Sequence, residues 1–255
     1  MSGSPSACEF LPRPDGERIA YCRIAGAAPG ILWLGGFKAD MGGTKAAHLA
    51  GWAALQGLAY TAFDHYGHGR SSGVFAEGTI GRYRQDALAI LDEITPGPQL
   101  LVGSSMGGWI ALLVALARPE RIAGLVLIAP ATDFTEDLIW AQASPEIRRE
   151  ILENGVWYRP STYDPEPYPI TRQLIEEARA HLLLRGRIAL SAPVHILHGT
   201  KDEDIPIERS LLLADRLASP DVIVESIELG DHRLSRPADL GRLEAAVGRL
   251  ALRGK

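Results

Sequence analysis

Residues 100–109 read LLVGSSMGGW, in which two adjacent serines separate an apolar run from a run of small residues. Gly103, Ser105 and Gly107 fit the pattern G-x-S-x-G, in which a serine occupies a sharp turn between a strand and a helix. An apolar run precedes this serine, and the apolar segment MGGWIALLVALA, which has the composition of a helix, follows it. The stretch therefore predicts a strand, a turn and a helix, with Ser105 as a nucleophile at the turn.

Ser104 is the alternative hydroxyl. With Ser104 at the centre, the flanking positions would be Val102 and Met106, whose side chains would clash in so sharp a turn. A serine here could instead do no more than cap the following helix. A cap does not require glycine on both sides, as Ser105 has. The capping role, or a role in shaping a pocket, therefore fits Ser104 better.

Short apolar runs alternate with longer segments of helical period along most of the chain. The runs predicted as buried strands are residues 30–36, 59–63, 99–103, 123–130, 193–199 and 222–229. The segments predicted as helices are residues 44–58, 79–94, 106–117, 208–218 and 238–252. This order implies right-handed crossovers and an α/β fold, with a mostly parallel, doubly wound sheet of about eight strands. An antiparallel hairpin from residues 6–25 is expected to precede it.

The alternation stops between residues 133 and 190, a stretch rich in aromatic residues, proline and charge. We expect it to hold one or two helices, a proline-punctuated loop and a further helix, without a strand. An excursion of this size from a compact sheet is usually a cap over a site, although an inert surface insertion is the alternative. The predicted domains are therefore a core of residues 1–132 and 191–255 and a helical cap of residues 133–190.

Composition limits the classes of partner. The chain has 255 residues and a net charge of −5 without a block of like charges, which argues against nucleic acid or an anionic membrane surface as the main partner. No run of about 18 apolar residues occurs, so no membrane span is expected. The histidines lack metal-ligand spacing such as H-E-x-x-H, so neither a metal nor another cofactor is predicted.

The N-terminal segment lacks the basic and apolar pattern of a secretory signal, and we therefore expect a cytoplasmic protein. Cys8 and Cys22 flank a predicted hairpin turn at Asp15-Gly16, so the two thiols could face each other across two strands. In the cytoplasm, free thiols are the expected state.

Five motifs in order give the chain its resemblance to the α/β-hydrolase superfamily of serine hydrolases. They are LGGF (34–37), DHYGHGRSSG (64–73), GSSMGG (103–108), HGTKDEDIP (198–206) and GDH (230–232). Within the superfamily, GGFKADMGGTKA (35–46) followed by FDHYGHGRSSG is similar to the branch of palmitoyl-protein thioesterases and acyl-glucuronide esterases. Gly35 departs from the many members that have histidine there, but that position serves the geometry of the turn.

The resemblance implies the α/β-hydrolase fold and the rest of a catalytic triad. The chain order in this fold is nucleophile, acid and histidine, with the histidine after the last strand, and this selects His232 as the general base. The pattern H-G-x-x-D-x-x-P selects Asp202 as the acid that orients the imidazole. A rarer layout would take the acid from Asp133. His198 is expected to pack or to bond within its turn.

The resemblance also implies an oxyanion hole made of two backbone N–H groups, those of Phe37 and Met106. His65 and His68 lie in the turn after the run at 59–63, and the resemblance places them in the floor of the pocket.

The predicted reaction is hydrolysis of carboxylic esters or thioesters through an acyl-enzyme on Ser105, with medium to long acyl chains, on a small molecule or an acylated protein. The aromatic residues expected to line an acyl pocket, or else to hold the cap, are Trp140, Trp157, Tyr158, Tyr163 and Tyr168. The arginines that could meet an anionic leaving group, if they are not simply solvated, are Arg148, Arg149 and Arg159. A monomer or homodimer is expected. The alternatives are a carbon–carbon bond hydrolase of ring-fission products and a non-catalytic sensor of a small ligand on the same fold.

Overall fold

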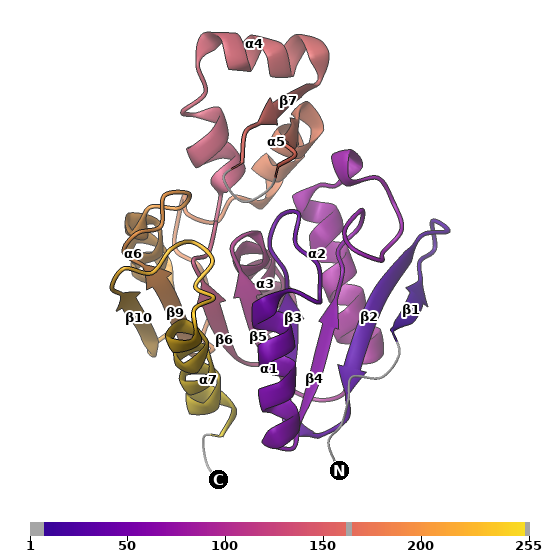
Figure 1. The fold of residues 1–255 in the computed structure, drawn as a ribbon, viewed down its shortest axis with the longest axis vertical. Helices are drawn as coiled ribbons and strands as arrows, with labels where there is room; N and C mark the ends of the chain where they lie inside the picture. Colours follow the sequence, from indigo (N-terminus) through magenta and orange to yellow (C-terminus); the bar gives the residue numbers. More distant parts are fainter. Residues whose placement is uncertain (1–7, 162–164, 253–255) are drawn as a thin grey trace.

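The computed structural model describes residues 8–161 and 165–252. Its centre is an eight-stranded sheet with the order β1-β2-β4-β3-β5-β6-β9-β10 (Figure 1). The strands are β1 (Glu9–Pro12), β2 (Arg18–Ile24), β3 (Ala27–Leu34), β4 (Leu58–Phe63), β5 (Gln99–Ser104), β6 (Ile122–Ile128), β9 (Val194–Gly199) and β10 (Val222–Ile227). β2 runs antiparallel to both β1 and β4, and every other pair is parallel. The predicted mostly parallel sheet with an N-terminal hairpin is confirmed.

Helices cover both faces of the sheet (Figure 1). One face carries α1 (Thr44–Leu55) and α7 (Pro237–Ala251). The other carries α2 (Ile80–Ala89), α3 (Met106–Ala117) and α6 (Ile207–Arg216). Shorter turns are η1 (Phe75–Glu77), η2 (Ile90–Ile94), which continues α2, and η3 (Pro119–Arg121).

The strands are apolar on both faces because each face packs under a layer of helices. In β3, Leu32 and Leu34 belong to the core under α2 and α3, whereas Ile31 and Trp33 belong to the core under α1 and α7. Successive side chains of a strand point to opposite faces, so a strand buried on both sides has an unbroken apolar sequence. This is why the apolar runs predicted the strands correctly.

The chain between β6 and β9 leaves the central sheet and lies beyond one end of it (Figure 1). It contains η4 (Thr135–Trp140), α4 (Pro145–Asn154), β7 (Val156–Arg159), β8 (Tyr168–Thr171), α5 (Arg172–Ala178) and η5 (Arg179–His181). β7 and β8 form a separate antiparallel pair, so the expectation of a stretch without strands is wrong. Strands of four residues are too short to show a two-residue period, and Pro169 within β8 weakens the strand signal further.

This segment is tied to the core at its return to the sheet. Asp133, which follows β6, accepts hydrogen bonds from the backbone N–H groups of Leu183 and Leu184 at 2.8–3.1 Å. The indole Nε1 of Trp109 on α3 donates to the carbonyl oxygen of His181 at 3.1 Å. The first contact joins the end of the segment to its beginning after β6, and the second joins it to α3 of the core.

The structure pairs Cys8 with Cys22 in a disulfide, with their Cα atoms 4.7 Å apart. The expectation of free thiols is therefore wrong. The cysteines can pair because of the register of the hairpin. β1 and β2 pair Glu9 with Tyr21, and this places the preceding Cys8 opposite Cys22. Within the described ranges, no helix combines the length and the apolar character that crossing a bilayer demands.

Candidate active site

Ser105 lies at the turn between β5 and α3 and has φ 54° and ψ −120°. A positive φ is uncommon for a residue with a Cβ and is usually retained at functional sites. Ser105 is the N-cap residue of α3, yet its side chain makes no capping hydrogen bond. Ser104 is the last residue of β5, so the N-cap position of α3 belongs to Ser105 and not to Ser104.

The two glycines of the motif are required by close backbone approaches. A Cβ on Gly107 would overlap the carbonyl oxygen of Leu34, and a Cβ on Gly103 would overlap the carbonyl oxygen of Gly107. Any side chain at either position would thus push β5, α3 and β3 apart. The glycines thus allow the tight turn at which Ser105 lies.

His232 and Asp202 come from two separate loops and meet at Ser105. Asp202 follows β9, and His232 lies between β10 and α7. Nε2 of His232 is 3.0 Å from Oγ of Ser105, and Nδ1 of His232 is 2.8 Å from Oδ2 of Asp202. The carboxyl ends of parallel strands share one edge of a sheet, so three residues distant in sequence are brought together there.

Asp202 has a complete set of hydrogen-bond donors. Oδ1 accepts from the backbone N–H groups of Asp204 and Ile205 at 3.0 and 2.9 Å, and Oδ2 lies 3.3 Å from Nε2 of His198. Burial would raise the pKa of Asp202, but hydrogen bonds from His198 and His232 and the charge of His232 outweigh it and hold the pKa well below its usual range. An ionised Asp202 accepts from Nδ1 of His232 and so leaves Nε2 to accept the proton of Ser105.

His198 is buried beneath the Asp202 loop. Its Nε2 donates to the carbonyl oxygen of Ile205 at 2.8 Å, and its Nδ1 accepts from the hydroxyl of Ser210 at 2.7 Å. The sequence interpretation expected bonding within the turn but missed the proximity to Asp202. The four-residue spacing between His198 and Asp202 was the available signal, because a turn after a strand can fold such a pair together.

Asp202, Asp204 and His232 are the described residues that come nearest to a cation site, with one ligand atom from each within 4.8 Å of the others. Asp202 already accepts from His232 and from two backbone N–H groups. Its lone pairs are therefore used within the protein, and the geometry suits proton transfer better than metal coordination.

The turn that follows β3 lies against the serine turn. A Cβ on Gly36 would lie 3.3 Å from Cβ of Ser105 and 3.9 Å from its Oγ, so only glycine allows this approach without displacement. Phe37 and Met106, the two residues with the predicted oxyanion donors, line the same cavity as Ser105. The structure thus brings both backbone segments to the nucleophile.

A cavity of about 570 Å³ opens at Ser105 and His232. Its apolar wall is formed by Phe37, Ala131, Phe134, Ile139, Tyr168 and Ile170. Its polar rim includes Lys38, Asp40, Lys45, Arg159, Glu203, Asp204 and Arg233. A volume of this size and a largely apolar wall with a few polar groups are typical of a pocket for a small molecule or an acyl chain.

The aromatic residues predicted for this pocket lie mostly elsewhere. Tyr168 lines it, whereas Trp140, Trp157 and Tyr158 are not part of its described lining. Trp140 lies beside two guanidinium groups, with those of Arg148 and Arg179 at 5.5 and 5.3 Å from its ring. Tyr158 is 57% exposed, and Tyr163 lies outside the described residues.

The composition of the segment did not reveal which side chains face inward. Phe134, Ile139 and Ile170 of this segment belong to the lining, and all three are at most 7% exposed. Of the three arginines considered for an anionic group, Arg159 reaches the rim, where it lies 3.7 Å from Asp204. Arg148 donates to the backbone carbonyl oxygen of Trp140 instead.

Known proteins with similar sequences identify the family of this chain. The profile of the family described as serine aminopeptidase, S33, matches residues 36–154. Mouse mitochondrial palmitoyl-protein thioesterase ABHD10 is 42% identical over 244 residues, which cover 95% of this chain and 82% of the mouse protein. The human protein of the same name is 39% identical, over 92% of this chain and 77% of its own length. This chain belongs to the α/β-hydrolase family.

Solved structures agree with this family assignment. A crystal structure of a protein from Agrobacterium vitis S4 superposes on this α/β hydrolase with a TM-score of 0.93 at 41% identity, over 98% of this chain and all of the other. Mouse α/β-hydrolase domain-containing protein 10 superposes with a TM-score of 0.90 at 40% identity, over 96% of this chain and 98% of its own. The predicted fold, the resemblance and the hydrolase class are confirmed.

The comparisons correct the expected location. The relatives are named as mitochondrial proteins, which contradicts a cytoplasmic location for this α/β hydrolase. The expectation depended on the lack of a secretory pattern. That pattern identifies proteins of the secretory route alone, and mitochondrial targeting segments have a different, amphipathic character.

Proposed function

We propose that this chain hydrolyses carboxylic esters or thioesters through an acyl-enzyme, with Ser105 as nucleophile, His232 as general base and acid, and Asp202 as the residue that orients His232. The observation that carries the proposal is the continuous pair of contacts from Oδ2 of Asp202 through His232 to Oγ of Ser105, at 2.8 and 3.0 Å. A serine hydroxyl is a weak nucleophile at neutral pH and needs a base within hydrogen-bond reach.

In the first half of the reaction, Oγ of Ser105 attacks the carbonyl carbon while Nε2 of His232 takes the hydroxyl proton. The N–H groups of Phe37 and Met106 donate to the oxyanion of the tetrahedral intermediate. As the intermediate collapses, the bond to the alcohol or thiol breaks and His232 returns the proton to that leaving group. Water then attacks the acyl-enzyme with His232 as base, which releases the acid and restores Ser105.

The acyl group that this pocket suits best is a medium to long chain. Two observations support this choice: the apolar wall of the cavity and the palmitoyl-protein thioesterase activity in the names of the mouse and human relatives. Burial of each methylene contributes roughly 0.8 kcal/mol, so an apolar wall favours longer chains over acetate.

We further propose that residues 133–190 act as a cap over the site. Phe134, Ile139, Arg159, Tyr168 and Ile170 all contribute to the wall or rim of the cavity from this segment. The cap would then set the length of the acyl chain, while the core supplies the reacting groups.

Turnover of a series of p-nitrophenyl esters from acetate to palmitate, compared with acyl-CoA thioesters and S-acylated cysteine peptides, tests the proposal. We expect kcat/KM to rise from acetate toward the longer chains, and a fluorophosphonate to label Ser105 but not the Ser105→Ala variant. Turnover confined to acetyl esters would contradict the preference for longer chains. Labelling without turnover of any substrate in the series would favour a sensor on the same fold.

A further inference from the structure

His68 lies in the loop between β4 and η1, close to the turn that follows β3. Its side chain is enclosed, with only 3% of the residue exposed. Three aromatic rings surround the imidazole: those of Phe37, Phe75 and Tyr83, with centroids at 6.4, 4.8 and 5.3 Å. The ring of His65 is also near, at 5.9 Å. Packing of this kind holds the imidazole in one orientation.

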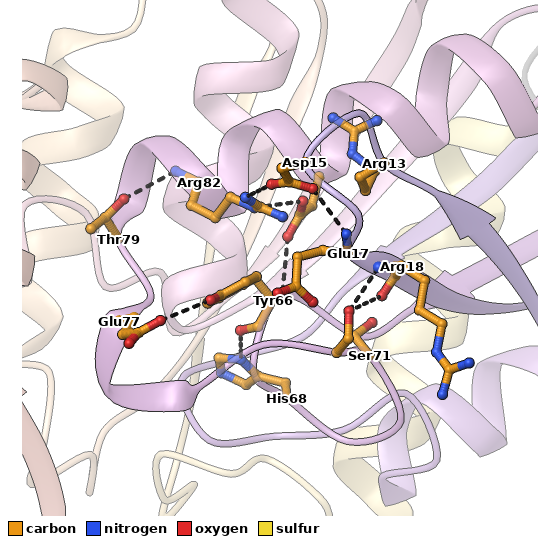
Figure 2. Close-up of polar contacts among 12 residues, drawn as sticks. Arg13, Asp15, Glu17, Arg18, Tyr66, His68, Ser71, Glu77, Thr79 and Arg82 are labelled. Carbon is orange, nitrogen blue, oxygen red and sulfur yellow. Dashed lines mark hydrogen bonds and ion pairs between the residues drawn. The ribbon is translucent and has the colours of Figure 1, made fainter.

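Both ring nitrogens of His68 contact backbone groups. Nδ1 lies 2.9 Å from the carbonyl oxygen of Tyr66, a contact drawn in Figure 2. Nε2 accepts from the backbone N–H of Lys38 at 3.1 Å. Because a carbonyl oxygen only accepts and a backbone N–H only donates, the two partners require the neutral tautomer with its proton on Nδ1. Burial lowers the pKa of His68 to about 4, so the ring stays neutral at neutral pH.

Tyr66, which carries this carbonyl group, is held through its own backbone N–H. The backbone N–H of Tyr66 donates to Oδ2 of Asp86 on α2 at 2.9 Å, and Nε of Arg82 lies 3.3 Å from Oδ1 of the same carboxylate. Figure 2 shows Arg82 above Tyr66, and His68 below both. A path of hydrogen bonds therefore runs from α2 through Tyr66 to the imidazole.

The other end of the path is the turn that contains Phe37. Lys38 has φ 58°, a left-handed conformation that costs free energy for a residue with a Cβ. Such a conformation persists only where neighbouring groups hold the backbone in place. The N–H of Lys38 belongs to the peptide group that follows Phe37 directly. A bond to this N–H fixes the rotation of that peptide group and thereby limits the directions that the N–H of Phe37 can take.

We infer that His68 is a positioning residue for the oxyanion hole. Its Nε2 accepts a hydrogen bond from the N–H of Lys38 and so keeps the N–H of Phe37 directed at the oxygen that becomes negative during acylation. This inference rests on the proposed function, in which the N–H of Phe37 stabilises that oxygen. It assigns His68 no contact with the substrate. The effect of losing it should therefore appear in the transition state rather than in substrate binding.

Two amide substitutions separate the two hydrogen bonds of His68. In His68→Gln the amide oxygen can reach about as far as Nε2 and accept from Lys38, whereas in His68→Asn the shorter amide can donate to Tyr66 but falls short of Lys38. We expect His68→Gln to keep kcat within about threefold. His68→Asn should lower kcat at least about tenfold with little change in KM. For comparison, removal of a whole oxyanion donor lowers kcat about 100- to 1000-fold. Affinity for a trifluoromethyl ketone, which Ser105 converts into an oxyanion, should fall by the same factor as kcat.

Equal losses of kcat in the two variants, or a rise in KM at unchanged kcat, would overturn the inference, because a residue that only fills space would act in that way. His48→Gln and His48→Asn form the matched control, since His48 lies on α1 with its Nε2 2.7 Å from Oε1 of Glu244, and neither change should alter kcat.

Amide hydrogen exchange gives a readout that does not depend on activity. The N–H of Lys38 should remain protected in His68→Gln and exchange faster in His68→Asn. Equal protection in both would contradict the inference even if the enzyme proved inactive. If the wild-type protein lacks turnover, or Ser105→Ala retains it, the proposed function fails, and that result is distinct from a failure of the His68 variants to differ.

Discussion

Asp133 and Asp202 are both buried carboxylates that follow neighbouring parallel strands, β6 and β9, but their oxygens have different partners. Asp133 accepts from the backbone N–H groups of Leu183 and Leu184, whereas Asp202 accepts from Nδ1 of His232. Asp133 was the alternative acid in the sequence interpretation. Its carboxylate instead joins the beginning of the segment between β6 and β9 to the end of that segment.

The first prediction follows from this difference between the two carboxylates. Asp202→Asn should lower kcat by orders of magnitude because the imidazole loses the acceptor that fixes its tautomer. Asp133→Asn should retain most of kcat but lower the free energy of unfolding by about 1–3 kcal/mol, because one of its oxygens is replaced by a donor facing backbone N–H groups. Steady-state kinetics and urea unfolding of both variants measure the two effects. A larger loss of kcat in Asp133→Asn than in Asp202→Asn would identify Asp133 as the acid of the triad.

The stability contributed by Asp202 should depend on pH. Its pKa is lowered in the folded protein, so its contribution is present above the unfolded value of about 4 and is lost as pH falls toward the folded value. The loss begins only below about pH 4, so the difference in unfolding free energy between wild type and Asp202→Asn should be larger at pH 7 than at about pH 2. Urea unfolding of both proteins at the two pH values measures it, and a difference that does not change with pH would contradict the assigned shift.

A pair of alanine variants tests which serine reacts. Ser105→Ala should abolish hydrolysis and fluorophosphonate labelling, since Oγ of Ser105 is the hydroxyl that lies 3.0 Å from Nε2 of His232. Ser104→Ala should keep most of both, because Ser104 lines the pocket from the end of β5 while the hydroxyl that contacts His232 belongs to Ser105. The opposite result would move the nucleophile by one residue and invalidate the G-x-S-x-G register.

The sequence predicted best those features that follow from local geometry. The turn at Ser105 could be predicted because close backbone approaches leave room only for glycine at positions 103 and 107. The meeting of the loops that carry Asp202 and His232 could be predicted from chain order, because the carboxyl ends of parallel strands lie at one edge of the sheet.

Features that depend on packing between distant segments could not be predicted in this way. The inward positions of Phe134, Ile139 and Ile170 depend on how η4 and β8 fold over the core. The aromatic residues chosen from composition alone, such as Trp140, contact charged side chains instead. The contact of His68 with Lys38 joins two loops 30 residues apart, and neither loop indicates it by itself.

Lys45 should support the position of His232. Lys45 is partly buried, and its Nζ donates to the backbone carbonyl oxygen of Arg233, the residue after His232. A hydrogen bond from a charged group contributes about 1.5–3 kcal/mol, so Lys45→Met should lower kcat about tenfold through a less ordered loop. Lys201→Met, a change of an exposed lysine at the same edge of the sheet, is the matched control and should leave kcat unchanged. Equal kcat in both variants would show that the loop holds His232 without Lys45.

Lys45 should also make stability rise with pH in the alkaline range. Burial lowers the pKa of Lys45 to about 8, although the charge of Asp231 opposes the shift. Between about pH 8 and the ordinary lysine value of about 10.4, the unfolded chain holds this proton and the folded chain does not, so the free energy of unfolding increases with pH. The wild type should thus gain stability relative to Lys45→Met between pH 7 and pH 9.5 in paired urea unfolding curves. A constant difference across that range would mean that the amine of Lys45 keeps an ordinary pKa in the folded protein.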